Sequence, residues 1–256
     1  MSNKYGWVKS PENPDDVYVE NHAAFKLTAE PIPDKIDLRQ YCSPVFDQKN
    51  IGSCTGNALV GALEYLENKD KDLESNGQFC HLSRLFVYYN EREVEGTVSQ
   101  DAGAHISDGI KVLSEEGACS ETVWPYDEKK FTIKPTVEAY QDGLTRKISG
   151  YAKVNQDLDS IKKVLASGYP IVFGFTVYPS FESEDVADSG EVDMPGIFEK
   201  AIGGHAVLLV GFKDSTKKFI VRNSWGPDWG DNGYFTLPYK YVIDPKLACD
   251  FWTITK

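Results

Sequence analysis

Several features are scarce in this chain of 256 residues, and each shortage excludes a class of function. No apolar run approaches the roughly 20 residues that a membrane-spanning helix needs. Basic residues are fewer than acidic ones: the chain has 27 Lys and Arg but 39 Asp and Glu, which gives a formal net charge of -12. Such an acidic chain has no electrostatic reason to bind nucleic acid or an anionic membrane, so neither is expected as a partner. The first six residues lack the apolar stretch of a secretory signal, which predicts a soluble protein that stays where it is made, unless a leader lies outside this sequence.

Cysteine is sparse, and its spacing excludes two common kinds of site. No C-x-x-C pair occurs, so a zinc or thioredoxin-like site has little support among Cys42, Cys54, Cys80, Cys119 and Cys249. An odd number leaves at least one thiol free in a monomer, and the sequence does not pair the other four. With 41% hydrophobic and 26% charged residues, the composition otherwise fits a globular protein of one sizeable domain or two small lobes.

The chain changes character along its length. Residues 1–34 carry four prolines and no sustained helical period, which predicts an extended segment rather than a packed domain. Residues 35–256 look globular, helix-rich to about residue 150 and strand-rich after it, which favours an α+β architecture with two lobes. Helical spacing of apolar residues predicts helices over 55–67, 82–89, 105–114 and 157–167. Apolar runs predict strands over 171–177, 206–210, 219–221, 234–237 and 251–255.

Cys54 occupies a position that favours a reactive thiolate. It lies at the start of the first predicted helix, where the dipole and unpaired backbone N–H groups favour an anion and lower a thiol pKa. Gly52 and Gly56 keep bulk away from the sulfur, and Ser53 is expected to cap the helix. A peptide carbonyl attacked there becomes an oxyanion that needs two donors, for which the Cys54 backbone N–H and the Gln48 amide are candidates.

A thiolate needs a base, and the chain has only four histidines. His105 lies on a predicted helix three residues before Asp108, where a local surface pair is expected. His205 instead follows two glycines and opens an apolar strand, which leaves its ring accessible from a cleft. Asn223 ends a later strand, where its oxygen can accept from an imidazole N–H while Trp225 shields that bond from water. Taken singly, these features also fit ordinary strand ends and turns.

Together the motifs resemble the papain family of cysteine peptidases, in its bacterial, archaeal and viral branch. Gln48 stands six residues before Cys54, His205 precedes an apolar strand, and Asn223 opens an Asn-Ser-Trp-Gly run, in the family's order. The separations between Cys54 and the later motifs are slightly longer than usual, which implies modest insertions. The resemblance covers roughly residues 32–256.

The resemblance implies a papain-like two-lobe fold, with a helical lobe bearing Cys54, a β-barrel-like lobe bearing His205, and the active-site cleft between them. It also implies a peptidase, most plausibly an endopeptidase, that cleaves protein or peptide substrates through a thioester acyl-enzyme, with no metal or organic cofactor. Protein inhibitors of papain-like enzymes are further conceivable partners. The alternatives are a Cys-His acyltransferase or transglutaminase, which lacks the Asn-Ser-Trp-Gly match, and a silent binding protein, against which the intact motifs argue.

The chain departs from the family pattern beside the nucleophile. Ile51 stands where the family has a cysteine, and Thr55 where it has an aromatic residue. One familiar disulfide therefore cannot form, and the loop before Cys54 is expected to be held by packing. The glycine pair that binds substrate backbone is matched only by Ala102-Gly103-Ala104, so the resemblance assigns that role to Gly103.

The substrate-binding candidates by this resemblance are Gly103, Gly204, Trp225 and Asp250. Asp250 falls about where the family places the base of its main specificity pocket, which predicts a preference for Arg or Lys. An acidic stretch over residues 182–193, expected to be a solvated loop, points the same way. The alternative is an apolar pocket from which Asp250 points away.

Residues 1–34 carry no helical motif like that of the family's usual propeptide. Tyr5, Trp7 and Tyr18 on this Pro-rich segment are expected to lie along the cleft as a lid, with a floppy tail as the alternative.

Overall fold

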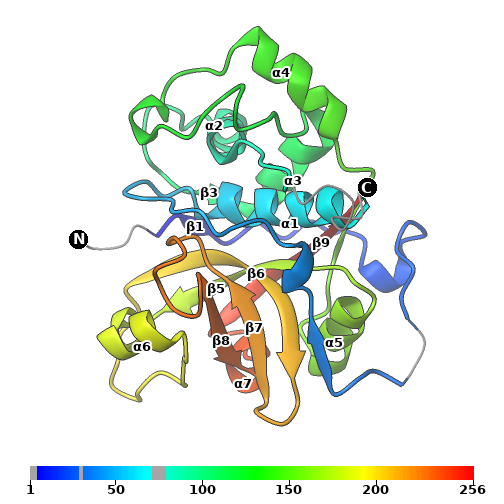
Figure 1. The fold of residues 1–256 in the computed structure, drawn as a ribbon, viewed down its shortest axis with the longest axis vertical. Helices are drawn as coiled ribbons and strands as arrows, with labels where there is room; N and C mark the ends of the chain where they lie inside the picture. Colours follow the sequence, from blue (N-terminus) through cyan, green and yellow to red (C-terminus); the bar gives the residue numbers. More distant parts are fainter. Residues whose placement is uncertain (1–4, 29–30, 71–78) are drawn as a thin grey trace.

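Two lobes lie against one another in the computed structural model, which describes residues 5–28, 31–70 and 79–256 (Figure 1). The upper lobe in this view is helical, and the lower lobe is built on an antiparallel sheet. This arrangement confirms the predicted α+β architecture.

The helical lobe is organised around one buried helix. It contains α1 (Cys54–Asp70), α2 (Arg84–Glu95), α3 (Ile106–Glu115) and α4 (Val137–Gly143). Nearly every residue of α1 is buried, because α2 and α3 cover one side and strand β6 of the other lobe covers another. The Ser83 side chain accepts from the Phe86 amide at 3.1 Å and caps α2, and Gly96 ends it in the left-handed region at φ 71°.

The second lobe is a sheet with the strand order β4-β9-β5-β6-β7-β8, and β2 pairs with β6 off this path. Its strands are β2 (Lys35–Asp37), β4 (Gly150–Lys153), β5 (Ile171–Val177), β6 (Gly203–Lys213), β7 (Lys218–Arg222), β8 (Tyr234–Pro238) and β9 (Ala248–Thr255). Helices α5 (Leu158–Ala166), α6 (Glu184–Ser189) and α7 (Tyr239–Val242) accompany them. No pairing between β4 and β8 closes the sheet within the described residues, so it is open rather than a barrel.

Each predicted helix and strand is present, with shifted ends. The expectation of a loop over 182–193 was partly wrong, because this stretch contains the short helix α6. Ser183 caps that helix by accepting from the Val186 amide at 3.3 Å, and six residues are too few to show a helical period in the sequence. The short elements β2, β4, α4 and α7 escaped prediction for the same reason.

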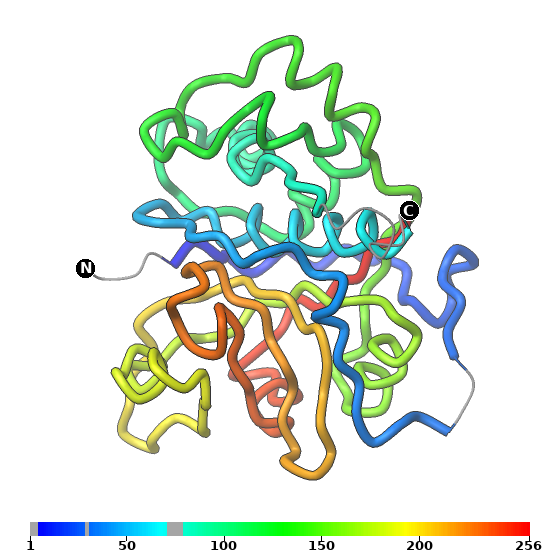
Figure 2. The backbone as a smooth tube through the Cα atoms, in the orientation of Figure 1, coloured from blue at the N-terminus to red at the C-terminus, as the bar shows by residue number. Residues whose placement is uncertain are grey.

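The N-terminal segment runs along the junction between the lobes (Figure 2). Its strand β1 (Trp7–Val8) pairs in parallel with β3 (Ala104–His105) of the helical lobe. Further along, Val19 and Phe25 are buried in the core of the sheet lobe. The described part of this segment is therefore packed against both lobes. Among the described residues, we find no helix that combines the length and apolarity needed to cross a membrane.

Candidate active site

The two lobes bring Cys54 and His205 together at their junction. Cys54 is the first residue of α1, and the Ala206 backbone N–H, directly after His205 on β6, donates to its sulfur at 3.5 Å. Both side chains have no exposed surface. Residues far apart in the sequence thus meet because α1 packs directly on β6.

Asn223 orients the His205 ring. Its Oδ1 lies 2.8 Å from His205 Nε2 and also accepts from the Ser224 N–H at 2.8 Å. The Ser224 backbone N–H can only donate, so the Asn223 atom that it contacts is the oxygen. The same oxygen faces His205, so His205 Nε2 must carry the proton. Trp225 stacks on the His205 ring with centroids 5.1 Å apart and planes at 27°. The other ring nitrogen, Nδ1, has no hydrogen-bond partner among the described residues.

Gln48 is held to the Asn-Ser-Trp-Gly motif from the opposite lobe. Its Oε1 accepts from the Ser224 hydroxyl at 2.6 Å, and its backbone N–H donates to the Ser224 carbonyl at 2.8 Å. Gln48 Nε2 donates to the Ile51 carbonyl at 3.0 Å, and because a carbonyl can only accept, this contact fixes the amide orientation. Ser224 is a member of this site that the sequence did not single out.

Burial holds the central pair in its neutral form in this structure. Desolvation raises the pKa of the Cys54 thiol to about 11, although hydrogen bonds from the backbones of Ala206 and Gly6 partly offset this rise. Desolvation likewise lowers the pKa of His205 to about 4, against the Asn223 hydrogen bond that raises it. Both groups are therefore neutral near pH 7 while the site is covered.

The cover is the N-terminal segment. The Tyr5 ring lies 5.9 Å from the His205 ring and 6.2 Å from Trp225, edge-on and tilted respectively. Its hydroxyl donates to Glu182. Gly6, the next residue, lies against Cys54. Position 6 has no room for a side chain, because a Cβ on Gly6 would lie 1.8 Å from the Gly52 carbonyl oxygen. The segment therefore fills the space above the sulfur.

The predicted substrate-binding residues contact this segment. The Gly6 carbonyl accepts from the Ala104 N–H at 2.8 Å, and a Cβ at Gly103 would lie 2.1 Å from the Gly6 oxygen. A Cβ at Gly204 would lie 2.8 Å from the Trp7 ring, which also lies against Gly174.

Asp250 lies at the end of the Trp7 side chain. The indole N–H donates to Asp250 Oδ2 at 3.1 Å, while the Trp252 indole donates to Oδ1 at 2.7 Å. Asp250 thus points into the space that holds Trp7 rather than away from it.

None of the five cysteines forms a disulfide, and the loop before Cys54 is held by hydrogen bonds. The Tyr126 hydroxyl donates to the Gln48 carbonyl, and an Asp101 oxygen accepts from the Gly52 N–H. Packing, the expectation from the missing disulfide, is therefore only part of what holds this loop. Sequence reasoning missed Tyr126 and Asp101 because neither belongs to a local motif.

Two other features are separate from this site. His105 pairs with Asp108, as predicted, with Nδ1 to Oδ2 at 3.0 Å, and with Glu95 at 3.2 Å. The three lie close enough to hold a cation, and His105 Nδ1 already contacts both carboxylates.

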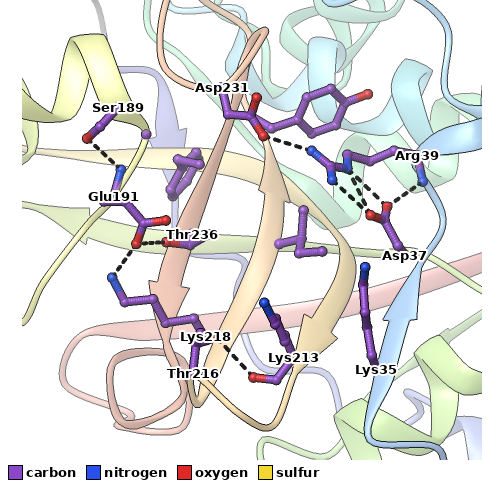
Figure 3. Close-up of a pocket in the computed structure, with 14 residues that line it drawn as sticks. Lys35, Asp37, Arg39, Ser189, Glu191, Lys213, Thr216, Lys218, Asp231 and Thr236 are labelled. Atoms are coloured by element: carbon purple, nitrogen blue, oxygen red, sulfur yellow. Dashed lines mark hydrogen bonds and ion pairs between the residues drawn. The ribbon is translucent and has the colours of Figure 1, made fainter.

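A hollow of about 390 Å³ is lined by residues of β2, β6, β7 and β8, among others. Figure 3 shows the residues that line it. Arg39 pairs there with Asp37 and Asp231, and Lys218 pairs with Glu191. Its charges largely neutralise one another, and none of the predicted catalytic residues lines it.

Comparisons with known proteins identify the family of this chain. The model of the papain family cysteine proteases matches residues 32–244. An uncharacterized peptidase C1-like protein of Acanthamoeba polyphaga mimivirus is 44% identical, over 99% of this chain and 87% of its own length. A cathepsin B-like protein of Giardia intestinalis is 30% identical over 82% of this chain and 71% of its own.

Solved structures show the same fold. The crystal structure of xylellain, a cysteine protease from Xylella fastidiosa, has a TM-score of 0.88 and 37% identity, and the match covers 100% of this chain and 98% of that one. Its likeness extends over the N-terminal segment as well as both lobes. The chain belongs to the papain family of cysteine peptidases.

Proposed function

We propose that Cys54, His205, Asn223 and Gln48 carry out peptide-bond hydrolysis through a thioester acyl-enzyme. The observation that carries this is the His205–Asn223 hydrogen bond, which leaves Nδ1 as the ring atom available to exchange a proton with Cys54. With the cleft open to water, the pair becomes a thiolate and an imidazolium, and the α1 N-terminus stabilises the anion.

The reaction then proceeds in two steps. Cys54 Sγ attacks the carbonyl carbon, the His205 Nδ1 proton passes to the leaving nitrogen, and the C–N bond breaks to leave a thioester. In the second step, His205 Nδ1 takes a proton from water, whose oxygen attacks the thioester. The C–S bond breaks, the acid product leaves, and the thiolate–imidazolium pair is restored. One water is consumed per bond.

Gln48 supplies an oxyanion donor in this proposal. Its carbonyl oxygen is occupied by the Ser224 hydroxyl, so the NH2 group is the part of the amide that faces the nucleophile loop. The second donor is the Cys54 backbone N–H at the start of α1. Removal of one such donor typically lowers kcat by roughly 100- to 1,000-fold.

Residues 1–34 act as a lid in the same proposal. Tyr5, Gly6 and Trp7 lie over His205, Cys54 and Asp250 in that order. In a substrate, the residues after the scissile bond lie on the His205 side, where the leaving amine is protonated, and those before it lie toward Asp250. The segment therefore runs opposite to a substrate, and it blocks the site without presenting a bond for cleavage.

The third element of the proposal is a preference for side chains with donors at the Asp250 pocket. That pocket receives the Trp7 indole, whose N–H meets the carboxylate. An Arg or Lys side chain there would form a hydrogen bond in which both partners are charged, which is stronger than the bond from the uncharged Trp7 indole. Gly204, Gly103 and Trp225 form the remaining substrate-binding surface.

A test of the whole proposal uses the full-length chain, a Trp7→Ala variant and a variant lacking residues 1–31. Each is assayed with a fluorogenic peptide library and with an epoxide that alkylates papain-type thiolates. We expect one equivalent of epoxide on Cys54, and both altered forms should cleave faster than the full-length chain. Tyr18→Ala is the matched control, because Tyr18 belongs to the same segment but its backbone pairs with Lys153 on β4, at one edge of the sheet. Equal rates for all four proteins would overturn the lid.

A further inference from the structure

The loop that carries Gln48 and leads to Cys54 has no covalent tie to the rest of the helical lobe. Ile51 occupies the place of the family's cysteine, and none of the cysteines forms a disulfide. An oxyanion donor must nevertheless be held within about half an ångström of its working position. The structure therefore needs another means of fixing residues 48–53.

One contact joins both ends of this loop through a single phenol. The Tyr126 hydroxyl donates to the Gln48 carbonyl at 2.6 Å and lies 2.7 Å from the Ser53 hydroxyl. The phenol has one proton, and a carbonyl can only accept, so Ser53 donates to the Tyr126 oxygen. Tyr126 thus connects the residue that bears the oxyanion donor to the residue before the nucleophile.

The surroundings keep this phenol in place and protonated. The Arg84 guanidinium stacks over the Tyr126 ring at 4.1 Å and over Phe46 at 4.5 Å, and donates to the Asp47 carbonyl at 3.4 Å. Burial raises the pKa of Tyr126, so the hydroxyl keeps the proton that it donates to Gln48.

A second contact holds the middle of the loop. Asp101 Oδ1 accepts from the Gly52 N–H at 2.9 Å and from the Tyr88 hydroxyl at 2.6 Å. The Tyr88 oxygen in turn accepts from the Gly103 N–H at 3.2 Å. Asp101 therefore links the nucleophile loop to the loop assigned to substrate backbone.

We propose that Tyr126 and Asp101 are positioning residues that together replace the missing disulfide, with Tyr126 acting on transition-state stabilisation through Gln48. Neither side chain touches substrate. The inference rests on the proposed role of Gln48, and the experiment separates the two.

The experiment measures peptide turnover and epoxide alkylation in the same set of variants. The set contains Tyr126→Phe, Gln48→Ala and the double variant, each made in the full-length chain and again with Trp7→Ala to weaken the lid. Alkylation forms no tetrahedral oxyanion, so its rate reports the thiolate alone, whereas kcat also reports Gln48. Tyr140→Phe is the matched control, because it removes a hydroxyl that donates to Asn90 at 2.7 Å elsewhere in the helical lobe.

We expect Tyr126→Phe to lower kcat about 10- to 100-fold with KM and the alkylation rate within about 2-fold of wild type. Tyr140→Phe should leave kcat unchanged although it lowers Tm by about as much as Tyr126→Phe does. The double variant should lose no more than Gln48→Ala, because both changes remove the same interaction. Asp101→Asn keeps an acceptor oxygen and should retain activity, whereas Asp101→Leu should lose it.

Three results would overturn the inference. The first is an unchanged kcat in Tyr126→Phe while kcat falls as expected in Gln48→Ala, which would keep the oxyanion role of Gln48 and refute the positioning role of Tyr126. The second is an additive loss of kcat in the double variant, and the third is an equal fall of turnover and alkylation; either would make Tyr126 a structural residue. A Gln48→Ala protein with full kcat would instead remove the oxyanion assignment itself, and this inference with it.

Discussion

The Trp7 indole and the Asp250 carboxylate meet at 3.1 Å, and this contact joins the covering segment to the far side of the cleft. The same oxygen accepts from the Ser10 N–H at 3.0 Å and the Ser10 hydroxyl at 2.8 Å. A single carboxylate oxygen thus holds three donors from the segment. Asp250 is consequently both the main attachment of the lid and the residue expected to select substrates.

Replacement of Asp250 should therefore change two properties together. In Asp250→Asn we expect faster epoxide labelling of Cys54, since the lid loses its charge-assisted contacts. The preference for Arg or Lys over Leu at the second position before the scissile bond should fall by about 5- to 150-fold.

The measurement is kcat/KM for matched peptides at low and high salt. Asp193→Asn is the control, because Asp193 is 93% exposed and its effect should vanish in salt. A wild-type profile that favours Leu or Phe at every salt concentration would contradict the specificity proposal.

Gly6→Ala should activate the enzyme. A Cβ at position 6 would lie 1.8 Å from the Gly52 carbonyl oxygen, so the larger side chain cannot fit and the segment must leave its place above Cys54. We expect epoxide labelling at least 10-fold faster than in the full-length wild type. Gly196→Ala serves as the control, since its nearest neighbour would be an ordinary 3.4 Å away. Unchanged labelling in Gly6→Ala would show that the cover does not limit access.

Cys54→Ala should abolish hydrolysis and leave the fold intact, because the change removes the nucleophile but little volume. His205→Ala should lower kcat by several orders of magnitude, since it removes the ring proposed to exchange its proton with Cys54. His105→Ala is the matched control: His105 serves Glu95 and Asp108, so turnover should stay within about 2-fold. Casein cleavage by folded Cys54→Ala protein would refute the assignment of the nucleophile.

Acid should open the lid in Cys54→Ala protein, where no thiolate shares a proton with the uncovered His205. While the site is covered, the pKa of His205 is about 4, below its ordinary 6.5, so the uncovered form of this variant binds more protons between these values. The covered state is therefore fully favoured above pH 6.5 and loses up to about 3 kcal/mol as pH falls toward 4. Hydrogen exchange of the Ala104 amide, which donates to Gly6, measures the opening.

His205→Gln, made in the same Cys54→Ala protein, removes the titrating ring and is the control for this pH effect. In that double variant the rise in Ala104 amide exchange between pH 6.5 and 4 should disappear. A rise of equal size in both proteins would assign the opening to a carboxylate such as Glu182 or Asp250 instead. Turnover by the opened enzyme should still follow a bell in pH, since it needs both the thiolate and the imidazolium.

Local pattern alone determined much of this protein. The apolar spacing after Cys54 predicts α1, and the apolar run after His205 predicts β6, because helical and strand periods are properties of neighbouring residues. The order Gln48, Cys54, His205, Asn223 was enough to indicate the family. The short helix α6 and the short strands β2 and β4 were missed, since a few residues cannot display a period.

Tertiary structure alone decided what covers and supports the site. Nothing local in the sequence says that Gly6 has no room for a Cβ, or that Trp7 lies on Gly174, because each partner comes from a distant part of the chain. The same is true of Tyr126, whose hydroxyl meets Gln48 from 78 residues away. Long-range contacts of this kind depend on how the two lobes pack, and that packing is fixed by the whole buried core rather than by any one segment.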